Sequence, residues 1–282
     1  MIRENKRKKR SYLLLILFIL LFFLSSYTNP LLAQSSDNDW KFDKEFLPRL
    51  GYDFKEVLTS PKNWDRGDLL TLSAVLGTGA LLCGFDRNIH DWVEDNRTSF
   101  SKDVSPYVSK CGNGLYLTGF MAALYISGEI SKNSCLRKTA LLSFGSFLAS
   151  SALVLGLKFA VGRARPSSGE SSHSFHLFSI RTSHTSFPSG DAASAWAVLT
   201  MIAEQSEKIW VDIFAYSLAS LVAFYRVHDN KHWASDAFIG SSLGFFVARK
   251  ISALNRKTNL GKLKVSFQFS GQRQAISFSL NF

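Results

Sequence analysis

Three short groups of residues in this 282-residue chain combine an imidazole, carboxylates, a hydroxyl and several cations. The last group holds His232 and Asp236, which are four residues apart. At this spacing on a helical turn, a carboxylate can accept from one imidazole nitrogen while the other nitrogen faces a substrate. The pair therefore predicts a histidine nucleophile at His232 that Asp236 orients. Without its neighbours, the same pair is equally well read as a loop histidine followed by a helix cap.

Cations flank this histidine in the sequence and also form the first group. Arg226 precedes His232 by six positions, and Lys158 and Arg165 bound the run Lys-Phe-Ala-Val-Gly-Arg-Ala-Arg, which is followed by Pro166. Alone, such residues read as a snorkelling lysine and a basic helix terminus. Beside a nucleophile, three cations predict a site for an anionic substrate.

The second group is a turn that leads into an apolar run, Pro188-Ser189-Gly190-Asp191. A helix that begins in this way presents free backbone N–H groups and a hydroxyl to an anion, and the helix dipole adds to the attraction. The ordinary alternative is a capped helix start with Ser189 or Asp191 as the cap. Together with the cations, the turn predicts a cradle for an anion.

The order and spacing of the three groups resemble those of the phosphatidic acid phosphatase type 2 and vanadium haloperoxidase superfamily, over roughly residues 67–252. The resemblance implies a six-helix core whose groups converge at one end and bind phosphate without a metal ion or another cofactor. It implies that His232 attacks phosphorus, that Asp236 holds its tautomer, and that water cleaves the phosphohistidine. The residues that it places around phosphate are Lys158, Arg165, Ser189, Gly190 and Arg226.

One position departs from the family pattern. The second group of the family usually ends in a histidine that protonates the leaving group, and Asp191 stands there instead. Asp191 can act as the acid if an apolar site or a neighbouring phosphate favours its protonated form, although a helix N-terminus favours the anion. The alternative donors are the histidines of the preceding loop, His173, His176 and above all His184.

The elements that must position these groups are predicted to be helices, so the fold class is all-α. Six apolar segments are expected to form a compact six-helix bundle: approximately 67–85, 113–130, 137–161, 190–205, 209–226 and 235–252. Only segment 137–161 comfortably exceeds the ~20 residues that cross a bilayer. Small residues such as Ala193, Gly240 and Gly244 favour close packing between helices.

The segments outside this bundle divide the chain further. A basic start followed by an apolar run predicts a signal peptide or a retained N-terminal anchor over residues 1–33. Residues 34–66 are expected to be an interfacial lead-in with short amphipathic helices. The helical domain spans 67–252, and alternating aromatics predict a basic linker and a β-hairpin tail over 253–282.

The charge pattern indicates the partner and the orientation. The net charge of +11 and the cations past the last apolar segment favour anionic lipid headgroups over nucleic acid. Those cations share one side of an alternating bundle with Lys132, Arg137 and Lys138, which puts the three groups on the periplasmic or exterior side of a cell-envelope membrane.

We therefore expect a phosphoric monoester hydrolase that acts on a lipid or polyprenyl phosphate or diphosphate. The alternatives are a catalytically weak phosphate-binding envelope protein and a secreted acid phosphatase with soluble substrates. A haloperoxidase is disfavoured, because Asp191 replaces the usual histidine and the core resembles a membrane bundle.

Overall fold

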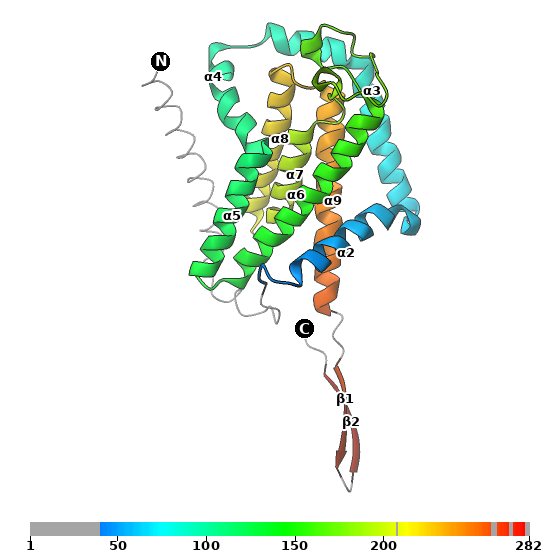
Figure 1. Ribbon diagram of the computed structural model, residues 1–282, viewed down its shortest axis with the longest axis vertical. Helices are drawn as coiled ribbons and strands as arrows, with labels where there is room; N and C mark the ends of the chain where they lie inside the picture. Colours follow the sequence, from blue (N-terminus) through cyan, green and yellow to red (C-terminus); the bar gives the residue numbers. More distant parts are fainter. Residues whose placement is uncertain (1–39, 207, 261–263, 271–272, 280–282) are drawn as a thin grey trace.

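The computed structural model describes residues 40–206, 208–260, 264–270 and 273–279. The predicted signal or anchor segment, residues 1–33, lies outside them. The described bundle is all-helical, as predicted (Figure 1). Its α-helices are α2 (Phe46–Thr59), α3 (Arg66–Asp95), α4 (Ser99–Val108), α5 (Gly114–Ile130), α6 (Ser134–Val161), α7 (Gly190–Glu204), α8 (Ile209–His228) and α9 (Ala234–Leu260).

The predicted number of helices was wrong, because the described residues form eight α-helices rather than six. All six predicted apolar segments are helical, in α3 and α5 to α9. The additional helices, α2 and α4, have apolar residues interspersed with polar ones, so neither contains a continuous apolar run. α2 lies in the segment expected to carry amphipathic helices, and it packs against α6 and α9.

α7 forms the centre of the bundle, packed against α6, α8 and α9. Nearly every residue from Ala192 to Ala203 is buried. α9 approaches this helix closely because it has glycines at the contact. A Cβ on Gly240 would lie 2.4 Å from the Ser189 carbonyl oxygen, and one on Gly244 would lie 2.1 Å from the Ala193 carbonyl oxygen. The small residues thus bring α9 against the start of α7.

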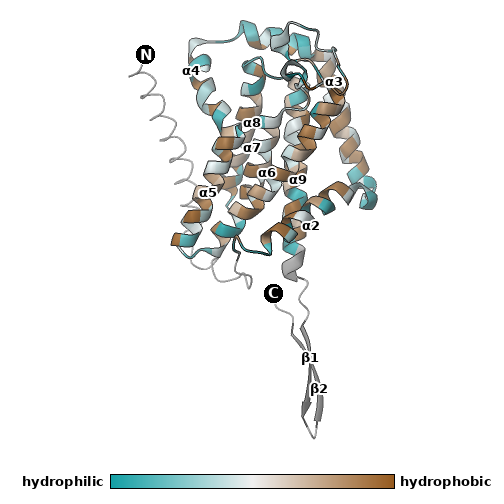
Figure 2. Cartoon of the chain, viewed as in Figure 1, coloured by the Kyte–Doolittle hydropathy of each residue, from teal (hydrophilic) through white to brown (hydrophobic). Residues whose placement is uncertain are grey.

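Four helices are long and apolar enough to cross a membrane: α3, α6, α8 and α9. The sequence had suggested only the segment that became α6. The other three helices extend beyond the apolar segments seen in the sequence. For example, α3 continues through Asp86 and His90 to Asp95. Figure 2 shows apolar residues along α3, α5 and α6 and hydrophilic residues gathered in the loops at the upper end of the bundle.

Four helix ends meet at this upper end of the bundle (Figure 1). α6 and α8 finish there, α7 and α9 begin there, and the segment between α6 and α7 covers them with two short 3-10 turns, Pro166–Ser168 and Thr182–His184. The three groups of the sequence lie at these four ends. The fold therefore gathers residues that are up to 78 positions apart, from Lys158 to Asp236, at one end of the bundle.

The C-terminal part contains two strands, β1 (Lys264–Ser270) and β2 (Arg273–Ser279). They pair antiparallel, with Phe267 opposite Ile276. Residues 271 and 272 between them lie outside the described part of the chain, so the predicted hairpin stays a prediction.

Candidate active site

The cations of the first group meet at Thr185, beyond the end of α6. The Lys158 ammonium donates to the Thr185 carbonyl oxygen at 2.5 Å, and Arg165 Nη2 donates to the Thr185 hydroxyl at 3.0 Å. α6 ends at Gly162, which is in the left-handed region at φ 60°. A Cβ on Gly162 would lie 1.7 Å from the His176 carbonyl oxygen. Only glycine therefore allows the chain to turn here and place Arg165 beside Lys158.

The second group is held at the start of α7. The buried Ser189 hydroxyl caps this helix by accepting from the Ala192 N–H at 3.4 Å, and the Ser189 N–H donates to the Asp236 carbonyl oxygen at 2.9 Å. The position of a Cβ on Gly190 lies 3.8 Å from Lys158 Cε. The N-terminus of α7, with its partial positive charge, thus faces the lysine of the first group.

His232 lies just after α8, and its side chain is 3% exposed. Its N–H and that of Lys231 donate to the Arg226 carbonyl oxygen, which ties the histidine to the arginine of the same group. His232 Nδ1 is 2.7 Å from the Ser186 carbonyl oxygen. Because a carbonyl can only accept, Nδ1 carries the ring proton in the neutral form and Nε2 carries the lone pair.

The predicted partner of His232 needs correction. Within the described residues, the Asp236 carboxylate accepts from the Ser186 hydroxyl at 2.5 Å, from the Trp233 N–H at 3.0 Å and from Arg163 Nη1 at 2.6 Å. The ring of His232 is instead held by the Ser186 carbonyl. Asp236 is therefore linked to the histidine only indirectly, because Ser186 forms hydrogen bonds with both. Asp236 lies in the first turn of α9, and its carboxylate caps the start of this helix by accepting from the Trp233 N–H.

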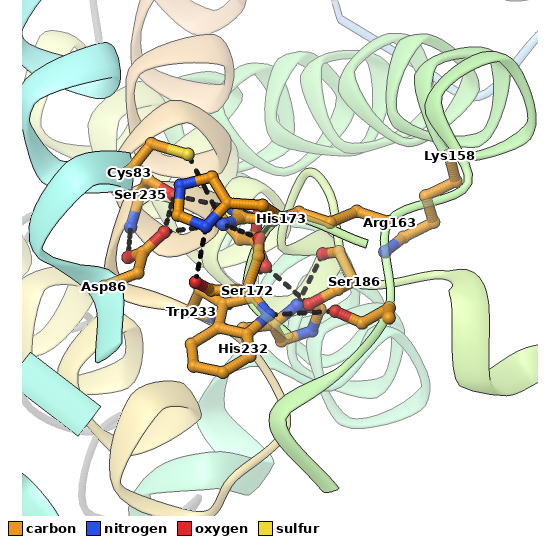
Figure 3. A network of polar contacts seen from close by, with 12 residues as sticks. Cys83, Asp86, Lys158, Arg163, Ser172, His173, Ser186, His232, Trp233 and Ser235 are labelled. Carbon is orange, nitrogen blue, oxygen red and sulfur yellow. Dashed lines mark hydrogen bonds and ion pairs between the residues drawn. The ribbon is translucent and has the colours of Figure 1, made fainter. Parts of the chain in front are cut away.

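Asp236 belongs to a buried cluster that also contains Arg163, Asp86 and Ser235. Figure 3 labels these three partners. Arg163 Nη2 donates to Asp86 at 2.7 Å, and the Ser235 N–H and hydroxyl donate to the same carboxylate at 2.9 and 2.5 Å. Arg163 also donates to the Ser172 carbonyl oxygen at 2.6 and 2.9 Å. We refer to Asp86, Arg163, Ser235 and Asp236 as the Arg163 cluster.

The positive charge around His232 is strong. Burial first, and then the charges of Lys158, Arg165 and Arg226, hold the pKa of His232 well below 6.5. Burial and then repulsion from Arg226 lower the pKa of Arg165. The Nε atoms of Arg165 and Arg226 are buried and have no hydrogen-bond partner among the described residues. These features leave the three cations, here named the cradle, ready for an anion.

Asp191 also lies at the cradle. Its carboxylate is 3.1 Å from Arg226 Nη2, and its side chain is 30% exposed. Asp191, the predicted proton donor, thus forms an ion pair with Arg226, a predicted phosphate ligand. His184, the alternative donor, is engaged elsewhere: Nδ1 contacts the Ser179 hydroxyl at 2.8 Å, and Nε2 lies 3.3 Å from Glu170.

Sequence reasoning missed Ser186 and Asp86. Ser186 acts on His232 through its backbone carbonyl, and a backbone group has no residue-type signal. Asp86 lies 150 positions before Asp236, at the polar end of an apolar segment, where a single carboxylate reads as a helix terminus. Arg163 follows the apolar segment 137–161, where a single arginine is indistinguishable from an ordinary basic helix end.

The three predicted groups lie together at one end of a helical core with membrane-spanning character. Comparison with known proteins identifies the class to which this combination is similar. Residues 139–259, which contain all three groups, match the model of the PAP2 superfamily. This confirms the resemblance seen in the sequence. With four helices able to cross a bilayer, the chain is a membrane protein.

Among curated proteins, lipid A 1-phosphatase of Porphyromonas gingivalis is 31% identical over 115 residues, which are 37% of this chain. The match spans less than a quarter of that relative, 23% of its length. A transmembrane PAP2 type phosphatidylglycerolphosphate phosphatase from Bacillus subtilis shares the fold, with a TM-score of 0.53 and 22% identity over 66% of this chain and 96% of that one. LpxE of Aquifex aeolicus gives a TM-score of 0.48 and 21% identity over 59% and 93%.

Proposed function

We propose that this chain is a phosphatase that hydrolyses a lipid or polyprenyl phosphate or diphosphate through a phosphohistidine on His232. One observation carries the proposal: a buried, neutral imidazole, whose Nδ1 is fixed by the Ser186 carbonyl, stands among three cations. Such an arrangement binds a phosphate dianion and presents Nε2 to phosphorus.

The chemistry proceeds in two displacements. Nε2 of His232 attacks phosphorus, and the bond from phosphorus to the leaving oxygen breaks while that oxygen takes a proton. Water then attacks the phosphohistidine, the P–N bond breaks, and phosphate leaves. Lys158, Arg165 and Arg226 neutralise the charge on the non-bridging oxygens in both steps. Ser189 and Gly190 add hydrogen bonds from the start of α7.

Asp191 supplies the proton in this scheme. In the free site it pairs with Arg226. When the substrate phosphate takes over Arg226, Asp191 loses its cation and stands beside new negative charge, and both changes favour its protonated form. The protonated carboxyl can then donate to the leaving oxygen, and the carboxylate that remains can accept a proton from the attacking water.

An apolar groove beside the site supports a lipid as the substrate. It has a volume of about 420 Å³ and is lined by residues of α3, α7, α8 and α9. Its lining includes Val227 and Ala234, which flank the His232 loop, together with Trp92, Trp196 and Phe238. An acyl or prenyl chain in this groove would keep its phosphate near the cradle. The similarity to a lipid A 1-phosphatase supports the same substrate class.

We further propose that the active site faces the periplasm or the exterior. The site lies at the upper end of the bundle in Figure 1, and the turn between α5 and α6, which carries Lys132, lies at the lower end. Cations near helix ends are retained on the cytoplasmic side. The opposite end, with the cradle, then faces out of the cell.

The Asp191–Arg226 ion pair favours a second candidate, a phosphate-binding protein with little turnover. A carboxylate that already occupies a cation of the cradle competes with the substrate. This candidate predicts that purified protein binds inorganic phosphate but releases none from a lipid phosphate.

The decisive variant is His232→Ala, which removes the nucleophile. Phosphate release from a lipid phosphate in mixed micelles should fall by about 10⁴-fold or more, since a covalent catalyst has no substitute. Rapid quenching with labelled substrate should trap phosphohistidine in the wild type and none in the variant. The exposed neighbour Lys231→Ala is the matched control and should retain turnover. A folded His232→Ala protein with near-normal rates would overturn the nucleophile assignment.

A further inference from the structure

The segment between α6 and α7 contains a group of side chains that the phosphatase chemistry does not use. Ligand atoms of Glu170, His176 and His184 all lie within 4.8 Å of one another. His176 Nε2 is 2.7 Å from Glu170 Oε2, and His184 Nε2 is 3.3 Å from Glu170 Oε1. Both imidazoles thus direct the same nitrogen toward one carboxylate.

We propose that Glu170, His176 and His184 form a binding site for Zn²⁺. Two imidazole nitrogens and one carboxylate are a common zinc ligand set, which leaves a fourth position for water. The two rings are stacked with centroids 3.8 Å apart. Because their planes are nearly parallel, at 11°, the rings must rotate toward each other before both Nε2 atoms can coordinate one ion beside the carboxylate.

The contact behind His184 suits this role. His184 is 7% exposed, and its Nδ1 is 2.8 Å from the Ser179 hydroxyl. A zinc-bound histidine must carry its proton on the nitrogen that faces away from the metal, and it usually donates that proton to a neighbouring oxygen. Ser179 is such an acceptor. When the Nδ1 proton is held there, the lone pair of Nε2 points to the position shared with Glu170 and His176.

Backbone hydrogen bonds hold the stretches that carry His176 and His184. The His176 N–H donates to the Gly162 carbonyl oxygen at 2.8 Å, and the Arg165 N–H donates to the Ser183 carbonyl oxygen at 2.9 Å. The ligands on both sides of the loop are therefore anchored to the segment that follows α6. Only side-chain rotations are then needed to close the site around an ion, which limits the conformational freedom lost on binding.

The site is connected to the cradle through consecutive residues. His184 precedes Thr185, which accepts from Lys158 and Arg165, and Ser186, which accepts from His232 Nδ1. An ion held by His184 would restrain this stretch and so stabilise the positions of the cations and the nucleophile. Glu170, His176 and His184 are thus positioning residues, and the ion makes no contact with phosphate.

Direct binding measurements test this proposal without relying on turnover. The full chain in detergent, freed of metal by a chelator, is titrated with Zn²⁺ by calorimetry and with Co²⁺ by visible absorption. We expect one ion per chain and the absorption of a tetrahedral site. His176→Ala, His184→Ala and Glu170→Gln should each weaken binding by at least about 10-fold, and Ser179→Ala by on the order of 10-fold. His173→Ala, in the same loop, is the matched control and should bind as the wild type does.

Thermal unfolding keeps the test valid if a variant folds poorly. Zn²⁺ should raise the melting temperature of the wild type and of His173→Ala but not that of the three ligand variants. His232→Ala should bind zinc normally, so failure of the phosphatase proposal leaves this result unchanged. Absence of stoichiometric binding by the wild type, or equal binding by the wild type and all three ligand variants, would overturn the zinc site.

Discussion

The cradle and the Arg163 cluster are adjacent, and both are built from charged side chains, yet they are balanced in opposite ways. Arg163 has a carboxylate on each side, Asp86 and Asp236, and its N–H groups are used by these and by Ser172. Arg165 and Arg226 have buried Nε atoms without partners among the described residues. The cluster is saturated with hydrogen bonds, and the cradle is not.

This difference separates a structural role from a functional one. Charges that satisfy one another inside a protein hold elements together, and they cost stability when one partner is removed. Three cations compensated only in part, here by the Asp191 carboxylate beside Arg226, are unfavourable until an oppositely charged ligand arrives. Ser186 joins the two regions, because its hydroxyl donates to Asp236 while its carbonyl accepts from His232. The saturated cluster thus provides a fixed frame for the unsaturated site.

The largest expected effect is on stability and comes from Arg163→Met. This change leaves Asp86 and Asp236 buried without their cation, which should cost about 3–5 kcal/mol of unfolding free energy. Denaturation in detergent, followed by circular dichroism, measures the loss. Arg165→Met is the matched variant and should cost far less, because it relieves repulsion with Arg226. Equal stabilities for the two variants would remove the distinction between cluster and cradle.

The next largest effect is on catalysis and comes from Arg226→Met. Removal of one donor to the developing charge should lower kcat/KM by on the order of 10²–10³-fold. The unfolding free energy should change little, since the partner that is left, Asp191, is partly exposed. Steady-state assays on a lipid phosphate measure the rate, and Lys231→Met controls for loss of a nearby cation. A fall no larger than that of Lys231→Met would place Arg226 outside the cradle.

Asp191→Asn sharpens the comparison further, because this carboxylate contacts the cradle but carries the opposite charge. If Asp191 donates the proton, the variant should slow substrates with alkoxide leaving groups by on the order of 10²-fold and largely spare activated aryl phosphates. If Asp191 only pairs with Arg226 and caps α7, both substrate types should keep most of their activity. Equal losses on both would contradict the acid role.

The smallest expected effect is a pH dependence of stability. The pKa of His232 is held well below 6.5 in the folded chain, so the unfolded chain binds this proton more readily. The stability tied to neutral His232 is therefore complete above about pH 6.5 and decreases as the pH falls further, by at most about 1.4 kcal/mol per pH unit. Unfolding measured between pH 5 and 8 should show a shallower slope for His232→Gln. Identical slopes would mean that the histidine is not buried in the neutral form.

The sequence predicts the cradle better than the frame that supports it. Lys158, Arg165, Ser189 and Arg226 are recognised because their types and spacing recur as a unit, and the structure brings them to one end of the bundle. Asp86 cannot be linked to Asp236 in this way, since only the packing of α3 on α9 brings the two near Arg163. The partner of His232 was also beyond sequence reasoning, because the spacing of Asp236 permits a direct contact that Ser186 replaces.

The central position of α7 has a consequence for how the protein is assembled in the membrane. With 15 residues, this helix is about 22 Å long, short of the ~30 Å hydrocarbon core of a bilayer. α7 is therefore not expected to insert as an independent span, and it requires α6, α8 and α9 around it. Because Ser189 and Gly190 begin this helix, the proposed phosphate site is expected to form only after the neighbouring helices are in place. Enzymatic activity would then report correct biogenesis, and a chain with misplaced neighbours would be inactive while all of its catalytic residues are present.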